Sequence, residues 1–226
     1  MNTKSKPAAL NHALLSRQAI DSSALAVRGV LMHRFAQPGR YEVYASRAGR
    51  VVHRELIEVA QDDGATQLDV RLGLPEDEGR CNCGGRSPQG GRLQAGGVMS
   101  FYAAKGVARY EVRIERWHDK GREEELDSAK GLPAGDLFGA ALVMPGCYRV
   151  RLGRKTLAEV VVRQPDAKPD PKKPHRTDQP VLLKTGQPPK APLELSAGTC
   201  LVIWLDEPGT VRVEPLELLG EKVKAA

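Results

Sequence analysis

The chain has 226 residues, of which 41% are hydrophobic, 27% are charged and 4% are aromatic. This composition is typical of a soluble globular protein and disfavours a disordered or membrane-embedded chain. The formal net charge of +6 admits a nucleic acid, an anionic membrane or an acidic protein as partner, but the basic residues are interleaved with 28 acidic ones, so nucleic-acid binding is disfavoured.

Neither a membrane span nor a secretory leader is expected. No apolar run is long enough for a transmembrane helix. Residues 1–18 contain basic side chains, but Asn11 and His12 interrupt their apolar stretch, which makes a poor secretory signal. We therefore expect a cytoplasmic protein, either free or part of an assembled particle or complex.

Residues 1–22 are predicted to form a short helix or an extended arm. Leu10 and Leu14 fall on one face of a helix that would begin after Pro7. Such a helix is too short to be stable alone, so it would cap a domain or dock on a partner. A frayed tail is the alternative.

The β pattern begins in a first block, residues 23–64. Segments 24–35, 41–45 and 51–59 read as strands, and the last two form a hairpin across residues 47–49. Three or four strands are too few to close a sandwich, so this block has to pair with another part of the chain.

Alternation is clearest in residues 141–162, which read ALVMPGCYRVRLGRKTLAEVVV. Tyr148, Val150 and Leu152 alternate with two arginines, and a period of two is typical of a half-buried strand. Gly153 then breaks the strand, and the chain returns as its partner. The Pro-Gly turn that enters this hairpin recurs twice, at residues 38–39 and 208–209.

The central block, residues 65–163, resembles an immunoglobulin-like β-sandwich. Its predicted strands are 66–72, 97–102, 108–117, 123–126, 137–143, 147–152 and 157–162. Their number and spacing match such a sandwich, which often keeps a tyrosine where Tyr148 lies, at the entrance to the penultimate strand. The resemblance is architectural, because the Cys…Trp…Cys arrangement of immunoglobulins is missing. It implies an all-β fold with one such domain or two.

A long loop, residues 73–91, interrupts this block and contains Cys81-Asn82-Cys83 followed by two glycines. Two thiolates one residue apart can bind a soft metal or form a redox couple. Structural zinc needs four ligands, however, and Cys147 and Cys200 lie in predicted strands. Cys81 and Cys83 are therefore the candidate metal ligands, and a plain loop that packs on a partner is the alternative.

Residues 164–180 are predicted to be an extended, Pro-rich linker. The C-terminal block, residues 181–226, adds predicted strands at 181–184, 193–195, 200–205 and 211–218. The sequence slightly favours a second sandwich in which residues 23–64 pair with residues 181–220. The alternative is a small extension packed on the central domain.

The sequence contains no Gly-x-Ser-x-Gly, phosphate loop, dinucleotide fingerprint or His-Glu-x-x-His motif, so we assign no catalytic residue and no cofactor. We predict a non-catalytic structural or accessory subunit that binds a larger protein complex or a homo-oligomeric assembly through sandwich edges, loops and terminal arms. One alternative is a metal- or redox-linked β protein that uses Cys81 and Cys83, for example as part of an oxidoreductase complex. The other is a basic nucleic-acid or phage-particle protein.

Overall fold

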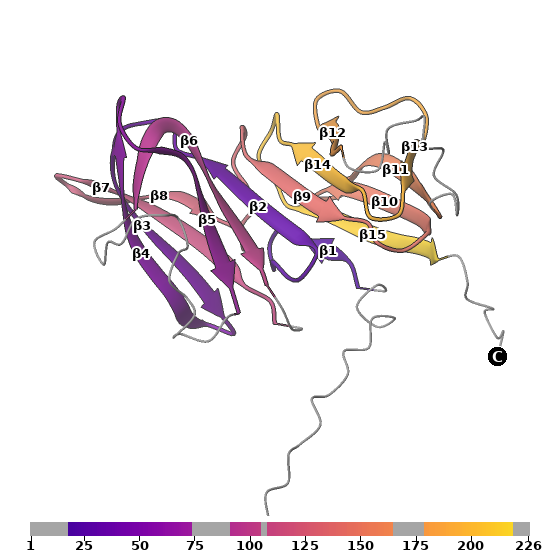
Figure 1. Cartoon of the computed structure of the whole chain (residues 1–226), viewed down its shortest axis with the longest axis horizontal. Helices are drawn as coiled ribbons and strands as arrows, with labels where there is room; N and C mark the ends of the chain where they lie inside the picture. Colours follow the sequence, from indigo (N-terminus) through magenta and orange to yellow (C-terminus); the bar gives the residue numbers. More distant parts are fainter. Residues whose placement is uncertain (1–17, 74–90, 105–107, 165–178, 219–226) are drawn as a thin grey trace, which may run out of the picture.

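The structure, a computed structural model, describes residues 18–73, 91–104, 108–164 and 179–218 (Figure 1). In these residues the chain forms strands and no α-helix, which confirms the predicted all-β class. Within the same residues, no helix is long and apolar enough to cross a membrane. Most of the predicted arm, of the 73–91 loop and of the Pro-rich linker lies outside the described residues.

Turns and loops join the strands along the described chain. The strands are β1 (Ile20–Asp21), β2 (Gly29–Arg34), β3 (Gly39–Arg47), β4 (Arg50–Ala60), β5 (Ala65–Leu72), β6 (Arg92–Ala103), β7 (Glu111–His118), β8 (Gly121–Asp127), β9 (Leu137–Ala141), β10 (Gly146–Leu152), β11 (Lys155–Arg163), β12 (Val181–Lys184), β13 (Leu193–Ser196), β14 (Cys200–Trp204) and β15 (Val211–Leu218). The strands gather into two lobes that lie side by side in Figure 1.

The first lobe holds β2 to β8, which belong to one continuous ten-stranded sheet that β6 divides into two layers. In one layer, β8, β7, β3 and β4 are neighbours, and β4 runs parallel to the first residues of β6. After Gly97, β6 continues into the other layer, where it pairs with β2 and β5. The ring of Phe35, which follows β2, packs edge-on against Tyr41 of β3 with 4.9 Å between the ring centroids. Side chains from the two layers therefore meet in the apolar core.

The second lobe repeats this arrangement with β9 to β15 and adds β1. One sheet has the order β1, β15, β10, β11, β13. Strands β12, β14 and β9 belong to the ten-stranded sheet, which reaches the second lobe through β2. As in the first lobe, each layer has one parallel pair, β11 with β13 and β12 with β14.

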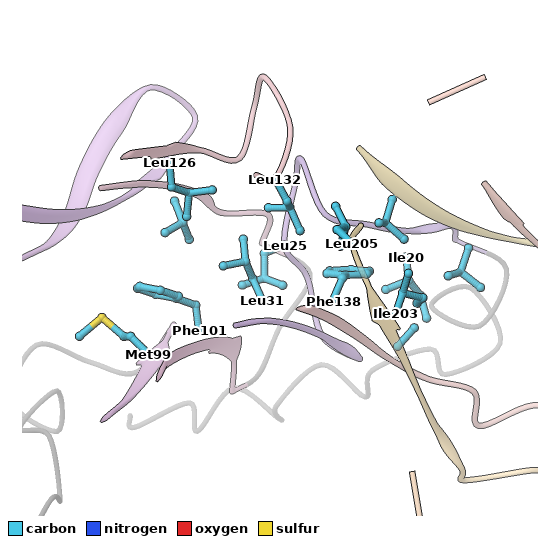
Figure 2. Packing of buried hydrophobic residues seen from close by; sticks show 14 of the residues in the cluster. Ile20, Leu25, Leu31, Met99, Phe101, Leu126, Leu132, Phe138, Ile203 and Leu205 are labelled. Atoms are coloured by element: carbon cyan, nitrogen blue, oxygen red, sulfur yellow. The ribbon is translucent and has the colours of Figure 1, made fainter. Parts of the chain in front are cut away.

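An antiparallel pair of strands, β2 and β9, joins the two lobes. Buried side chains form one cluster that crosses this junction, where Leu25, Leu31, Leu132 and Phe138 are each at most 1% exposed (Figure 2). Because the hydrophobic core runs from one lobe into the other, separating the lobes would expose these side chains to water.

The observed strand pairing differs from the grouping expected from the sequence. Strands β2, β3 and β4 of the block 23–64 pair with strands of the block 65–163, namely β6, β7 and β9. In the described residues, no strand of 23–64 pairs with a strand of 181–220. The physical reason is that alternation marks a strand and its buried face, whereas it does not specify the neighbouring strand.

Two of the Pro-Gly turns form the same structure, one in each lobe. Tyr41 and Tyr148 are buried, and each hydroxyl donates a hydrogen bond of 2.7 Å to a backbone carbonyl four residues earlier, that of Gln37 or Met144. A Cβ on Gly146 would lie 2.3 Å from the Glu217 carbonyl oxygen, so this turn requires glycine. The two corners fix β3 and β10 in equivalent positions.

Candidate interaction surface on the β3, β4, β7 and β8 sheet

A buried carboxylate lies on the outward face of the first-lobe sheet. Glu42 follows Tyr41 in β3, so the alternation of the strand turns its side chain away from the core. The side chain is nonetheless fully buried because two arginines cover it. Arg54 contacts one carboxylate oxygen, and Arg122 Nη1 lies 2.9 Å from the other.

The environment of Glu42 keeps it ionised. Burial alone would raise the pKa of this carboxyl group. Hydrogen bonds from Tyr44 and Arg54, together with the charges of Arg122 and Arg54, outweigh burial and lower the pKa of Glu42 below its ordinary value. At neutral pH, Glu42 is therefore a carboxylate that holds two guanidinium groups in place.

Aromatic rings support the arginines around Glu42. The guanidinium of Arg113 lies 5.1 Å from the centroid of the Tyr44 ring, and that of Arg122 lies 4.7 Å from the centroid of the Trp117 ring. Arg122 Nη1 also donates a hydrogen bond of 2.9 Å to the Tyr44 hydroxyl. At these distances, cation–π attraction adds to the ion pairs and restricts the arginine side chains.

Glu115 of β7 links the remaining members of the network. Its carboxylate lies 3.3 Å from both Arg113 and Arg122. Beside this network, Leu56 of β4 pairs with Glu42 in the sheet and is 52% exposed, and Trp117 is 43% exposed. We define the arginine–aromatic face by the side chains that share this surface: Glu42, Tyr44, Arg54, Leu56, Arg113, Glu115, Trp117 and Arg122.

The second lobe has no equivalent of this cluster among its described residues. Because β3 and β10 begin at matching tyrosine corners, Arg149 and Arg151 of β10 occupy the positions of Glu42 and Tyr44. Arg149 instead pairs with Glu159 of β11 at 3.7 Å. A shared fold alone therefore does not require a buried acid and an aromatic ring at these positions.

The predicted metal ligands Cys81 and Cys83 lie outside the described residues, and the metal site stays a prediction. The other cysteines, Cys147 and Cys200, are half-buried free thiols, and burial raises the pKa of Cys200. Among the described residues, no group of three or more His, Cys, Asp or Glu side chains has a geometry that would hold a metal ion.

His33 and His53 each lie in a strand beside a carboxylate, but the fold does not bring these two histidines together. His33 of β2 is buried, and its Nδ1 lies 2.9 and 3.0 Å from the two carboxylate oxygens of Asp136. His53 of β4 lies 3.5 Å from Glu55. β2 and β4 are not neighbouring strands.

A shallow groove lies where the turn after β8 meets residues 208–209. Its lining includes Glu124, Asp127 and Lys130. Lys130 Nζ lies 2.7 Å from Glu124 and 3.2 Å from Asp127, and these contacts raise the pKa of Lys130. The groove thus pairs its own charges and offers a ligand few unengaged groups.

Sequence reasoning did not single out the arginine–aromatic face. A usable signal was the alternation Arg113, Glu115, Trp117, which places two charges and an indole on one side of a strand. The pairing of this strand with the one that carries Glu42 and Tyr44 is a non-local contact, and local patterns do not reveal it.

Comparison of the chain with known protein families gives no match, and neither do comparisons with curated proteins and with solved structures. Its function has to be inferred from its own residues and their geometry.

Proposed function

We propose that this chain is a non-catalytic structural or accessory subunit that binds a larger protein assembly, and that the arginine–aromatic face is its principal contact surface. The observation that carries the proposal is the buried carboxylate of Glu42, which fixes Arg54 and Arg122 beside the exposed rings and Leu56. A cytoplasmic location, within or beside such an assembly, is part of the same proposal.

The composition of the face favours protein binding. Tryptophan, tyrosine and arginine are the residues that most often carry the binding energy of protein interfaces. Trp117 and Leu56 present apolar area, while Arg113 and Arg122 present hydrogen-bond donors around it. This pattern of apolar groups among ordered polar ones is typical of an interface core with its rim.

Preorganisation strengthens the case. An arginine that is free in solution loses side-chain entropy when it binds a partner. Arg122 already contacts Glu42, Glu115, Tyr44 and Trp117, so most of that entropy is lost on folding. The partner chemistry that fits is an apolar side chain flanked by carboxylates or backbone carbonyls, which accept the remaining guanidinium N–H groups.

We also propose that each lobe is an immunoglobulin-like sandwich. Each has about seven strands in two layers, and each contains a buried tyrosine corner, a feature of such sandwiches. Sandwich domains commonly serve as rigid supports for binding surfaces.

Site-specific photo-crosslinking in the native host tests the proposal. A photo-reactive amino acid replaces Leu56, and a matched control replaces Glu159, which pairs with Arg149 as Leu56 pairs with Glu42. We expect position 56 to crosslink to a defined protein and position 159 not to do so. Trp117→Ala should weaken the binding of that protein by about 2 kcal/mol or more. Equal crosslinking at both positions, or none at position 56, would contradict the proposal.

A further inference from the structure

The two halves of the chain, before and after the turn at residues 119–120, contain the same strands in the same order. β1 to β5 correspond to β8 to β12, β6 corresponds to β13 followed by β14, and β7 corresponds to β15. The parallel pairs show this directly. β4 pairs with the start of β6 as β11 pairs with β13, and β5 pairs with the end of β6 as β12 pairs with β14.

Equivalent serines in the two halves, Ser22 and Ser128, make the same pair of hydrogen bonds to a valine backbone. Ser22 donates its backbone N–H to the Val211 carbonyl at 2.9 Å, and its Oγ accepts from the Val211 N–H at 2.9 Å. Ser128 makes the same two bonds with Val112, also at 2.9 Å. Both serines are completely buried. The first of these pairs connects the first half to the second lobe, and the other connects the second half to the first lobe.

The contact between β2 and β9 is symmetric. Leu31 lies opposite Phe138, and the flanking pairs are Val30 with Gly139 and Met32 with Leu137. Leu31 of β2 and Phe138 of β9 are equivalent, since they pair with equivalent residues of β6 and β14, Phe101 and Ile203. A two-fold rotation between Leu31 and Phe138 thus maps each half onto the other, as in a symmetric dimer.

Each half also completes the sheet of the opposite lobe. β1 lies along β15 with Ile20 opposite Val213, and β8 lies along β7 with Leu126 opposite Ile114. All four side chains are buried. If the halves separated, β7 and β15 would each lose a neighbouring strand, and the core at Leu31 and Phe138 would open to water.

We infer that the two halves associate as the two subunits of a dimer do, and that the peptide link at residues 119–120 is not needed to hold them together. Their interface consists of the β2–β9 pair and the reciprocal contacts of β1 and β8. Its buried apolar side chains and its exchanged strands resemble an obligate dimer interface rather than a contact between tandem domains. This inference does not depend on the proposed function.

Cleavage of the full chain tests it. A specific protease site is inserted at Lys120, in the exposed turn beside Gly121, where a Cβ would meet nothing within 4 Å. After cutting, we expect both fragments to co-elute at the size of the intact chain in non-denaturing buffer and to separate only in denaturant. Co-production of residues 1–119 and 120–226 as two chains should give the same complex.

Two substitutions in the cleaved protein sharpen the test. Leu31→Ala at the centre of the interface should raise the dissociation constant of the fragments at least tenfold. Val150→Ala, equally buried but inside the second lobe, should lower thermal stability without that change in association. The inference is overturned if the cut fragments separate while each keeps its β-sheet spectrum, if they unfold on cutting, or if the two substitutions affect association equally.

Discussion

Leu31 and Phe138 face each other in the β2–β9 pair, and each is the structural counterpart of the other. Both are completely buried at the junction of the lobes (Figure 2). The central position of this pair means that one symmetric contact joins the two lobes into a single core. Among the described residues, the arginine–aromatic face lies on the first lobe, and the second lobe has no equivalent cluster.

The equivalent serines give a paired stability test. Ser22→Ala and Ser128→Ala each remove the acceptor of a buried valine N–H, which costs about 1–3 kcal/mol. We expect similar losses in urea unfolding because the two environments match. A large loss for Ser128→Ala with none for Ser22→Ala would show that β1 does not complete the second lobe.

The two tyrosine corners, at Tyr41 and Tyr148, allow a second pair of matched stability measurements. Tyr41→Phe and Tyr148→Phe each remove a hydroxyl that donates to a backbone carbonyl, so each should lower the free energy of unfolding by about 0.5–1.5 kcal/mol. Chemical denaturation measures both losses. Tyr102→Phe serves as the control, since Tyr102 is only half-buried and no hydrogen bond of its hydroxyl is found in the described residues. A loss for Tyr102→Phe as large as those at the corners would refute this account.

Unfolding at alkaline pH should follow the ionisation of the buried Tyr41 hydroxyl. Burial chiefly raises the pKa of Tyr41 from 10.0 to about 12. A group whose pKa is higher in the folded state contributes stability that is present below its unfolded pKa and lost as the pH rises through the folded value. We expect stability to fall between pH 10 and about 12 in a melting series. Tyr41→Phe should show a shallower fall, and identical slopes in the two proteins would argue against this cause.

Two histidine–carboxylate pairs of similar length should differ because one is buried and the other exposed. Asp136→Ala leaves the buried His33 without its hydrogen-bond acceptor, and leaving a buried polar group unsatisfied costs about 1–3 kcal/mol. His118 and Glu123, 2.8 Å apart, are both exposed, and His118→Ala should change stability by no more than about 0.5 kcal/mol. Asp136→Asn, which keeps an acceptor, should fall between them. Equal effects in thermal melts would disprove the ranking.

Local patterns were enough to predict the strands but not their partners. The alternation at Tyr148 and Val150 correctly predicted a strand with one buried face, and the Pro-Gly turns at Pro38 and Pro145 proved equivalent. The third turn differs, since Gly209 bridges Leu132 in the way that Tyr110 bridges Leu25. The Pro-Gly dipeptide at residues 208–209 therefore forms a bridge to Leu132, whereas the other two Pro-Gly turns enter tyrosine corners.

The duplication had a faint signal that the sequence analysis did not use. Asp21-Ser22 and Asp127-Ser128 each precede a Pro-Gly-x-Tyr corner at nearly the same distance. Most other equivalent positions share only their apolar character, as Leu31 and Phe138 do, because packing constrains volume and polarity more than identity. For the face around Glu42, the sequence held only the alternation on β7, because the members of the face come from four separate strands whose pairing is non-local.

Amide hydrogen exchange of the unmodified protein tests the central claim most directly. The Ser22 and Ser128 amides bond across the boundary between the halves, and the amides of β3 and β10 lie inside the lobes. If the halves form one cooperative core, Ser22 and Ser128 exchange only through the same global opening as β3 and β10. Rapid exchange at Ser22 and Ser128, with β3 and β10 still protected, would contradict the account.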